Sequence, residues 1–363
     1  MLPEDMTPNR SQAQKLLAWY TQHNPWWRGN RWGSEAISQS LKREESRMTT
    51  HRPFRFGVSV HQARSKDAWI ATARHAEALG YSTLLMPDHL GDQFAPVPAL
   101  LAAAEATQSL CIGSLVFDND FRHPVMLAKE AATLDVLSGG RFEFGLGAGW
   151  ERSEYEQAGM AYDPPAERVS RMEEALHIMK GLFADDPVTF SGKYYQINDF
   201  KGHPRPVQRP HPPILIGGGG KRTLTLAARE ATIVGFSPAF RGPDGGADYT
   251  DATPESLLQK VAWVRQAAGD RFNELELSIL VAEVFTTEER EAAAQFIART
   301  MAPDLPNLTP EVVLSVPYLL IGSVDQICAD LLARREQFGI SYITVFERSM
   351  EALAPVVTRL AGT

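Results

Sequence analysis

Residues 214–230 read ILIGGGGKRTLTLAARE, with four consecutive glycines between a strand-like segment and a helix-like segment. Residues 214–216 are branched and apolar, which is typical of a buried strand, and residues 221–230 have the composition of a helix. Each glycine loses more conformational entropy on folding than any other residue, so a run of four needs a reason. Either the backbone is left bare so that it can approach a ligand, or the segment is an unconstrained loop.

The same alternation of strand and helix runs through the chain from residue 54 onward. The predicted strands are 54–60, 82–86, 110–117, 141–147, 213–217, 231–236, 276–285 and 341–346. The predicted helices are 65–80, 97–107, 124–137, 167–183, 221–230, 254–268, 287–300 and 323–338. Strands separated by helices pair in parallel through crossover connections. Eight such units favour a closed (β/α)8 TIM barrel over a doubly wound open sheet.

Several segments interrupt this repeat. Residues 185–200 alternate in polarity around a Ser-Gly turn, which predicts a β-hairpin inserted after the fourth helix. Residues 201–213 are proline-rich and extended. A glycine-rich loop is predicted over 241–254 and a helical excursion over 300–320, before the last unit. We expect the last two segments to shape a substrate pocket.

The composition of the chain excludes several classes of protein. It has 363 residues, of which 44% are hydrophobic and 22% charged, as is usual for a globular protein. A net charge of −8 argues against a nucleic-acid partner, and no apolar run is long enough to cross a membrane. Cys111 and Cys328 have no metal-ligand spacing, so we predict reduced thiols and no metal. We therefore expect a cytoplasmic homodimer that acts on a small-molecule substrate.

Residues 1–50 fall outside the repeat, so we predict an N-terminal extension followed by one barrel domain over 51–363. Residues 11–23 could form an amphipathic helix, and residues 24–33 contain three of the seven tryptophans. Such a cluster usually marks a contact surface, here on the barrel itself or on a partner subunit. The alternative is that translation starts at Met48.

Polar side chains follow the first three predicted strands. His61 follows the first strand, Asp88 and His89 follow the second, and Asp118 follows the third. Barrels of this kind place their chemistry at the C-terminal ends of the strands. These four residues are therefore candidate site residues, although strands also carry polar residues wherever they emerge into solvent.

Glycines follow the next two strands. The GLGAG segment at 145–149 resembles a dinucleotide-binding turn only weakly, because no helix is predicted directly after it. Residues 217–220 lead straight into a helix beside Lys221 and Arg222. Free amides at a helix N-terminus next to two cations favour a phosphate site, with a plain loop as the alternative.

Six segments together resemble the luciferase-like monooxygenase superfamily, and within it the actinobacterial branch of coenzyme F420-dependent oxidoreductases. They are RFGVSV (55–60), AEALGYSTLLMPDHL (76–90), LVFDNDFRHP…GLGAGW (115–150), GLFADDPVTFSGKYY (181–195), PRPVQRP…ATIVG (204–235) and YLLIGSVDQI…ITVFE (318–347). The resemblance implies a (β/α)8 barrel with a flavin-type ring at the C-terminal ends of its strands. Relatives use either F420 or FMN.

The resemblance also implies cofactor-binding residues at matching positions. Residues expected to hold the cofactor phosphate are Gly217, Gly218, Gly219, Gly220 and Lys221. Residues expected to lie along the cofactor are Gly147, Ala148 and Gly149, with Leu115 and Val116 joined by a non-proline cis peptide against the ring. Because F420 has an acidic tail, a basic rim is expected, with four candidates: Arg205, Arg209, Lys221 and Arg222.

The Asp-His pair of the family matches Asp88 and His89, and the histidine faces the reacting region. We expect His89, held by Asp88 or a neighbour, to donate or accept a proton, because histidine titrates near neutral pH. A structural role for His89 is the alternative. His61 and Asp118 are candidate substrate contacts.

The resemblance favours an F420-dependent oxidoreductase that transfers a hydride to or from a small organic substrate. An FMN-dependent monooxygenase with a separate reductase and a non-catalytic flavin-binding barrel are the alternatives. A sugar-phosphate dehydrogenase subgroup has an acidic residue where this chain has Trp150, followed by Glu151, and a tryptophan after the Asp-His pair that is absent here. We therefore do not predict sugar-phosphate chemistry.

Overall fold

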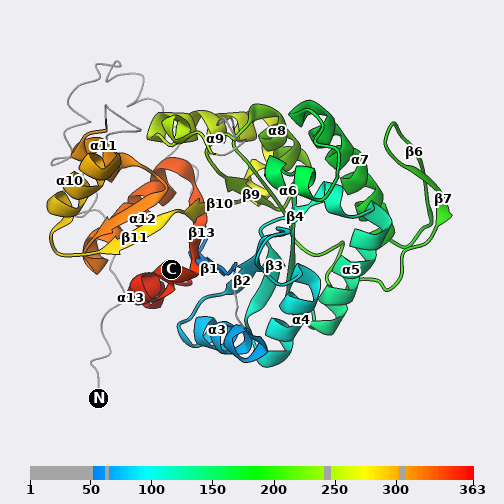
Figure 1. Cartoon of the computed structure of the whole chain (residues 1–363), viewed down its shortest axis with the longest axis horizontal. Helices are drawn as coiled ribbons and strands as arrows, with labels where there is room; N and C mark the ends of the chain where they lie inside the picture. Colours follow the sequence, from blue (N-terminus) through cyan, green and yellow to red (C-terminus); the bar gives the residue numbers. More distant parts are fainter. Residues whose placement is uncertain (1–51, 62–64, 241–246, 302–307) are drawn as a thin grey trace.

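The computed structural model describes residues 52–61, 65–240, 247–301 and 308–363, so the predicted N-terminal extension lies outside the described residues. Within them, eight parallel strands follow the order β3-β2-β1-β13-β10-β9-β8-β5, and β3 also pairs with β5, which closes the ring (Figure 1). The strands are β1 (Arg55–Ser59), β2 (Thr83–Met86), β3 (Cys111–Ser114), β5 (Phe142–Gly147), β8 (Ile214–Gly218), β9 (Ile233–Phe236), β10 (Glu276–Val281) and β13 (Ile340–Phe346). The predicted (β/α)8 barrel is confirmed.

Helices lie at the predicted places along the chain, and all of them except α10 cover the outside of the barrel. They are α3 (Lys66–Ala78), α4 (Pro96–Ala106), α5 (Pro124–Leu137), α7 (Pro165–Phe183), α8 (Lys221–Glu230), α9 (Pro254–Ala268), α10 (Arg290–Met301) and α12 (Val324–Phe338). Pro124 begins α5, where its missing N–H costs nothing. A capping box of Ser323 and Gln326 begins α12, and Gly339, at φ +76°, ends it.

The alternation along β5 shows how each strand serves two cores. Phe142, Phe144 and Leu146 face the helices and belong to the large core between the barrel and its helical layer. The residues between them face the barrel axis. A small inner core fills the barrel and consists of Leu85, Leu215, Ile233 and Tyr342.

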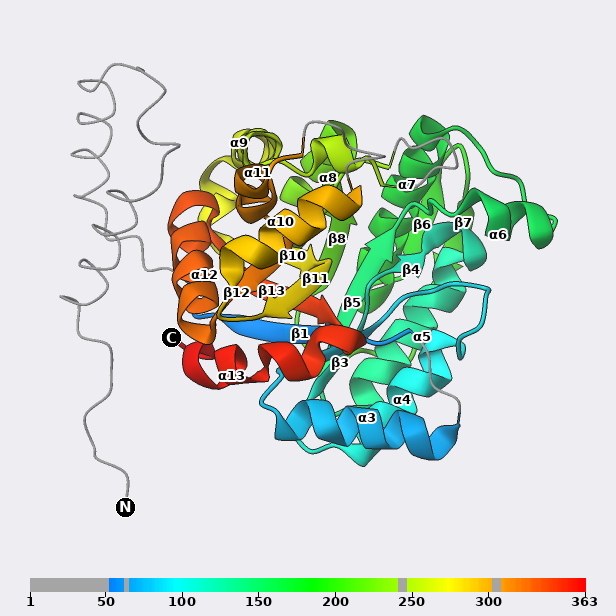
Figure 2. The same cartoon turned by 60° about the vertical axis from the view of Figure 1, so that its left-hand side comes forward.

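Two predicted strands are interrupted. The third ends at Ser114 and resumes as β4 (Phe117–Asp118), which pairs with β5. The seventh divides into β10 and β11 (Glu283–Thr286), because the Ala282 N–H donates to the carbonyl of Tyr318 at 2.8 Å, away from the barrel. Strand β11 then pairs with β12 (Leu319–Gly322). The prediction of a helical segment up to residue 320 was therefore wrong for its last two residues, which begin this strand. Helix α11 (Pro310–Ser315) is the helical part, and it packs with α10 on this small sheet (Figure 2).

The predicted hairpin is confirmed as β6 (Val188–Ser191) and β7 (Gln196–Phe200), which project beside α7 (Figure 1). Two helices were not predicted: α6 (Arg152–Gln157), directly after the β5 loop, and the C-terminal α13 (Met350–Leu360). Pro355 lies inside α13, and proline disfavours helix interiors. No helix in the described ranges is long and apolar enough to cross a membrane.

Candidate active site

Three glycines lie side by side inside the barrel, near the C-terminal ends of neighbouring strands. We call Gly147 of β5, Gly217 of β8 and Gly235 of β9 the glycine floor. Gly217 and Gly235 are direct register partners, and β8 lies between β5 and β9. A Cβ on Gly217 would meet only the Gly235 carbonyl oxygen, at 3.9 Å. One layer below, Leu215 and Ile233 fill the inner core, so the floor is flat backbone that a planar ring can approach.

The segment between β3 and β4 borders this floor. The peptide bond between Leu115 and Val116 is cis, as the resemblance implied. Both side chains are half-buried and pack against the inner core. Val116 Cγ2 lies 2.5 Å from where a Cβ on Gly147 would be, so Val116 covers that end of the floor. The structure therefore brings these three predicted residues together, and their contact with a ring stays a prediction.

The first turn of α8 has the properties of an anion site. Gly220 is its N-cap, and no side chain caps the helix there. Gly220 is exposed, with no atom within 4 Å of the position that a Cβ would take. The first N–H groups of α8 therefore keep their hydrogen-bonding capacity and the positive end of the helix dipole. These features fit a phosphate group.

The sequence predicts that all four glycines of the run are there to hold the cofactor phosphate. In the structure, two of them are glycine for a different reason. A Cβ on Gly218 would lie 2.8 Å from Thr223 Cγ2, and one on Gly219 would lie 2.5 Å from the backbone nitrogen of Ala239. These two glycines permit close packing against α8 and against the segment after β9. Gly217 and Gly220 face open space, so these two positions leave room for a ligand.

The predicted basic rim is only partly assembled. Lys221 is exposed beside Trp263 of α9, with Nζ 6.0 Å from the ring centroid. Arg222 donates two hydrogen bonds of 2.7 Å to α7. Arg205 pairs with Asp185 in the loop after α7. Arg209 lies on the segment that enters β8 at its N-terminal end, so these two candidates for the basic rim lie at the opposite end of β8 from the start of α8.

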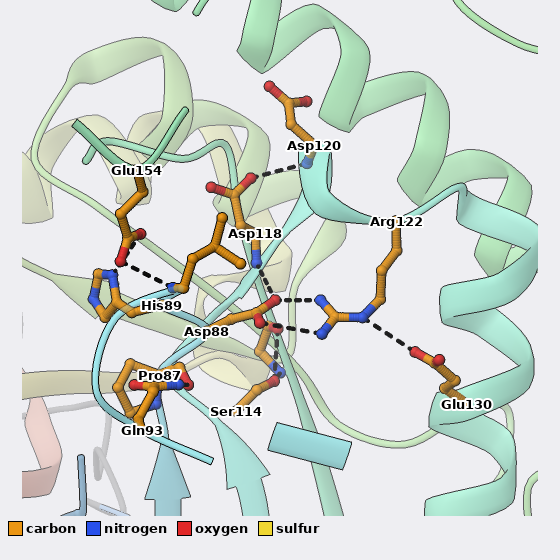
Figure 3. Close-up of polar contacts among 12 residues, drawn as sticks. Pro87, Asp88, His89, Gln93, Ser114, Asp118, Asp120, Arg122, Glu130 and Glu154 are labelled. Atoms are coloured by element: carbon orange, nitrogen blue, oxygen red, sulfur yellow. Dashed lines mark hydrogen bonds and ion pairs between the residues drawn. The ribbon is translucent and has the colours of Figure 1, made fainter. Parts of the chain in front are cut away.

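His89 is held by a residue that was not predicted. Its Nδ1 lies 3.0 Å from Oε2 of Glu154 on α6, and Oε1 of Glu154 accepts the N–H of Leu90 at 2.9 Å (Figure 3). The ring of Trp150 meets the imidazole edge-on, with centroids 5.7 Å apart. These contacts occupy Nδ1 and direct Nε2 away from Glu154.

Asp88 has a different set of partners. Both of its carboxylate oxygens bind Arg122, and Oδ2 also accepts the N–H of Asp118 at 3.1 Å. Arg122 reaches on to Glu130 of α5, with Nε 3.3 Å from Oε2 (Figure 3). Asp88 therefore does not hold His89, contrary to one of the two predicted arrangements, and Glu154 holds it instead. Asp88 is only 6% exposed, and its position favours a structural role at the strand ends.

His61 lies at the same end of the barrel as His89. Its ring meets Phe346 edge-on at 5.2 Å. Burial lowers the pKa of His61, and electrostatic interaction with His89 and Arg348 lowers it further. Phe240 packs on Trp150 with ring centroids 5.2 Å apart. The described residues of the mouth are therefore largely aromatic.

Asp118 lies beneath the β5 loop, away from the mouth. Its carboxylate accepts the Tyr155 hydroxyl at 2.8 Å and the N–H of Asp120 at 2.8 Å. A Cβ on Gly149, which has φ +76°, would lie 2.6 Å from Asp118 Oδ2. Burial raises the pKa of Asp118 to about 7, and the carboxylates of Asp120 and Asp88 also raise it. The prediction that Asp118 contacts substrate finds no support in this buried position.

We predict that Asp118→Asn removes a pH dependence of stability. The pKa of Asp118 in the folded protein is about 7, above its usual value of 3.8. The contribution of protonated Asp118 to the stability of the fold is therefore complete below about pH 4 and is lost as pH rises through 7. Between about pH 5 and pH 8 the wild type should lose roughly 1–3 kcal/mol of unfolding free energy relative to the variant. Urea unfolding at both pH values measures this, with the exposed Asp186→Asn as control. If the unfolding free energies of the wild type and of Asp118→Asn changed equally with pH, the raised pKa of Asp118 would be contradicted.

Arg168 is another residue that the sequence did not indicate. Its side chain is buried on α7 and donates to the carbonyls of Ala148, at 3.1 Å, and Gly149, at 3.3 Å. It also lies 4.0 Å from the ring centroid of Tyr162. Arg168 therefore holds the β5 loop in place. No pattern in the sequence distinguishes Arg168 from the other charged residues at the start of this helix.

A cavity of about 510 Å³ opens at the other end of the barrel, among Phe54, Arg55 and Glu276. Arg55 fills the N-terminal end of the barrel axis, where it pairs with Glu143 and, at 2.7 Å, with Glu276. Barrel enzymes place stabilising networks at this end and chemistry at the opposite end. The candidate active site is therefore the mouth formed by His61, His89, the glycine floor and the start of α8.

Residues 46–303, more than half of the chain, match the family model described as luciferase-like monooxygenase. The chain belongs to this family. A luciferase-like relative, the F420-dependent glucose-6-phosphate dehydrogenase of Nakamurella multipartita, is 30% identical over 256 residues, which cover 67% of this chain and 71% of that protein. The FMNH2-dependent dimethylsulfone monooxygenase of Pseudomonas putida is 34% identical over 131 residues, which cover 36% of this chain and 35% of that protein.

The fold of this luciferase-like chain is also similar to solved structures. The coenzyme F420-dependent tetrahydromethanopterin reductase of Methanopyrus kandleri superposes with a TM-score of 0.66 at 17% identity. The superposition covers 85% of this chain and 99% of the reductase. At this identity the likeness concerns the fold alone.

Proposed function

We propose that this luciferase-like protein is an F420-dependent oxidoreductase, which transfers a hydride between the deazaflavin and a small organic substrate. The observation that carries the proposal is the uncapped start of α8 beside the glycine floor, where Gly220 and Gly217 leave open space. A phosphate and a planar ring fit these two surfaces. The F420-dependent relative, which aligns over two thirds of this chain, favours F420 over FMN.

The residues that would hold the cofactor follow from this fit. The amides of Gly220 and Lys221 would bind the phosphate, and the backbone from Gly147 to Gly149 would lie along the ring beside Val116. When bound, F420 supplies hydride chemistry like that of a nicotinamide and does not activate oxygen, whereas FMN does both.

The protein itself would supply proton transfer and the exclusion of water. His89 Nδ1 is occupied by Glu154, so Nε2 is the atom that would give or take a proton at the substrate. Phe346, Trp150 and Phe240 would shield the site and favour an apolar substrate surface. Trp150 stands where the sugar-phosphate subgroup has an acidic residue, so we propose a different substrate class.

Two sets of reactions test this function, one anaerobic with reduced F420 and one aerobic with reduced FMN. Reduced F420 is mixed with a panel of aldehydes, ketones and α,β-unsaturated compounds without oxygen, and reduced FMN is mixed with the same panel in air. We expect substrate-dependent oxidation of F420 in the first set and no product in the second. Oxygen-dependent product with FMN, and none with F420, would support the monooxygenase instead.

The FMN-dependent monooxygenase is the second candidate, and the 34% identical sulfone monooxygenase favours it. Its match covers about a third of each chain, which is why we place it second. The open glycine floor and the held His89 argue against a non-catalytic barrel. We also propose that the enzyme is a cytoplasmic homodimer.

A further inference from the structure

We propose that Glu154 is a positioning residue that fixes the tautomer of His89, with the proton on Nδ1 and the lone pair on Nε2. The inference deepens the proposed function and rests on it only in giving His89 the proton-transfer role. Glu154 lies on α6, and its side chain is 14% exposed, against 28% for His89. The pair is therefore largely shielded from water, which strengthens the hydrogen bond between them.

The two carboxylate oxygens of Glu154 serve two consecutive residues. Oε2 lies 3.0 Å from Nδ1 of His89, and Oε1 accepts the backbone N–H of Leu90 at 2.9 Å (Figure 3). A carboxylate only accepts hydrogen bonds, so Nδ1 must carry the proton. In the neutral imidazole the other nitrogen, Nε2, is then unprotonated and able to accept a proton.

The position of Glu154 is set by its neighbour in the sequence. Tyr155 is fully buried, and its hydroxyl donates to Asp118 at 2.8 Å. Its ring also meets Tyr162 edge-on at 5.1 Å. These contacts anchor α6 against the layer beneath the β5 loop. The carboxylate of Glu154 is therefore presented to the loop after β2 from a fixed helix.

Other groups near the pair leave this arrangement undisturbed. Arg152, on the same helix, pairs with Glu156 at 2.6 Å. The rings of Trp150 and His89 meet edge-on, with planes at 86°. Trp150 therefore restricts rotation of the imidazole without competing for Nδ1. Glu154 thus acts on the orientation and the tautomer of His89 and does not itself need to reach the substrate.

The variant Glu154→Gln tests the proposal because it changes chemistry and hardly changes shape. The backbone N–H of Leu90 can only donate, so we expect the glutamine carbonyl oxygen to turn toward it. The glutamine NH2 group then faces Nδ1 of His89 and can only donate. The proton of the imidazole should therefore move from Nδ1 to Nε2. We expect kcat to fall roughly 10- to 10³-fold, with KM changed less than about 2-fold.

The tautomer is read directly from ¹⁵N-histidine NMR spectra of the cofactor-free protein, recorded over a pH series so that the signals of the neutral imidazole are observed. The chain has nine histidines, and the signals missing in His89→Ala assign His89. We expect Nδ1 protonation in the wild type and Nε2 protonation in Glu154→Gln. The matched control, Glu156→Gln, changes a carboxylate on the same helix that is 58% exposed, and it should leave spectrum and kcat unchanged.

The outcomes separate this inference from the proposed function. An unchanged His89 tautomer in Glu154→Gln overturns the inference, whatever happens to kcat. Exchange of the tautomer supports it. Since the spectra need neither cofactor nor turnover, full activity of His89→Ala would contradict the proposed proton-transfer role and leave the positioning by Glu154 standing.

Discussion

Replacing Gly220 with aspartate is expected to weaken cofactor binding at least about 100-fold while the barrel stays folded. An aspartate at an N-cap accepts hydrogen bonds from the first amides of the helix, so its carboxylate would take the place of the cofactor phosphate and repel it. Gly220 has extended backbone angles and open space around it, so the substitution meets no steric obstacle. Calorimetric titration of the cofactor measures the affinity.

Stability provides the control for this variant. Because aspartate caps the helix and complements its dipole, the unfolding free energy should be unchanged or up to about 1 kcal/mol higher. Gly220→Ala adds a methyl group without an acceptor and should bind the cofactor within about 10-fold of the wild type. If Gly220→Asp bound the cofactor with wild-type affinity, the phosphate site could not lie at the start of α8.

Replacing His89 with alanine is expected to lower kcat by roughly 10²–10⁴-fold, because the proton at the reacting atom would lose its carrier. Cofactor affinity should change little, since the predicted phosphate and ring surfaces lie on β5, β8 and α8. Steady-state kinetics and cofactor titration on the same preparation measure both quantities. An equal loss of turnover and of cofactor affinity would make His89 a structural or ring-contacting residue.

The periodicity of the sequence was sufficient to predict the barrel. Residues 124–137, 221–230 and 254–268 are helices with the predicted ends, since proline or glycine marks their starts. Strand β12 was missed because a short apolar run beside a predicted helix has no decisive period. Its partner, β11, is a segment about 36 residues earlier that only the fold brings near.

The site was predictable only where it depends on local sequence. The glycines and the Asp-His pair stand at strand ends, and strand ends meet in a barrel. The partner of His89 was not predictable in this way, because Glu154 lies 65 residues further along the chain. Asp118 also ends a strand, but Tyr155, 37 residues later, covers it from beneath the β5 loop. Which side of a loop a side chain occupies follows from such distant contacts.

The most direct test of the account is a pair of calorimetric titrations of the purified protein, one with F420 and one with FMN, at low and high salt. The proposal predicts stoichiometric binding of F420 that weakens at high salt, because its phosphate is held by an exposed helix start beside Lys221. FMN should bind at least about 10-fold more weakly. Tight binding of FMN with no measurable affinity for F420 would contradict the central claim and establish the flavin monooxygenase as the better account.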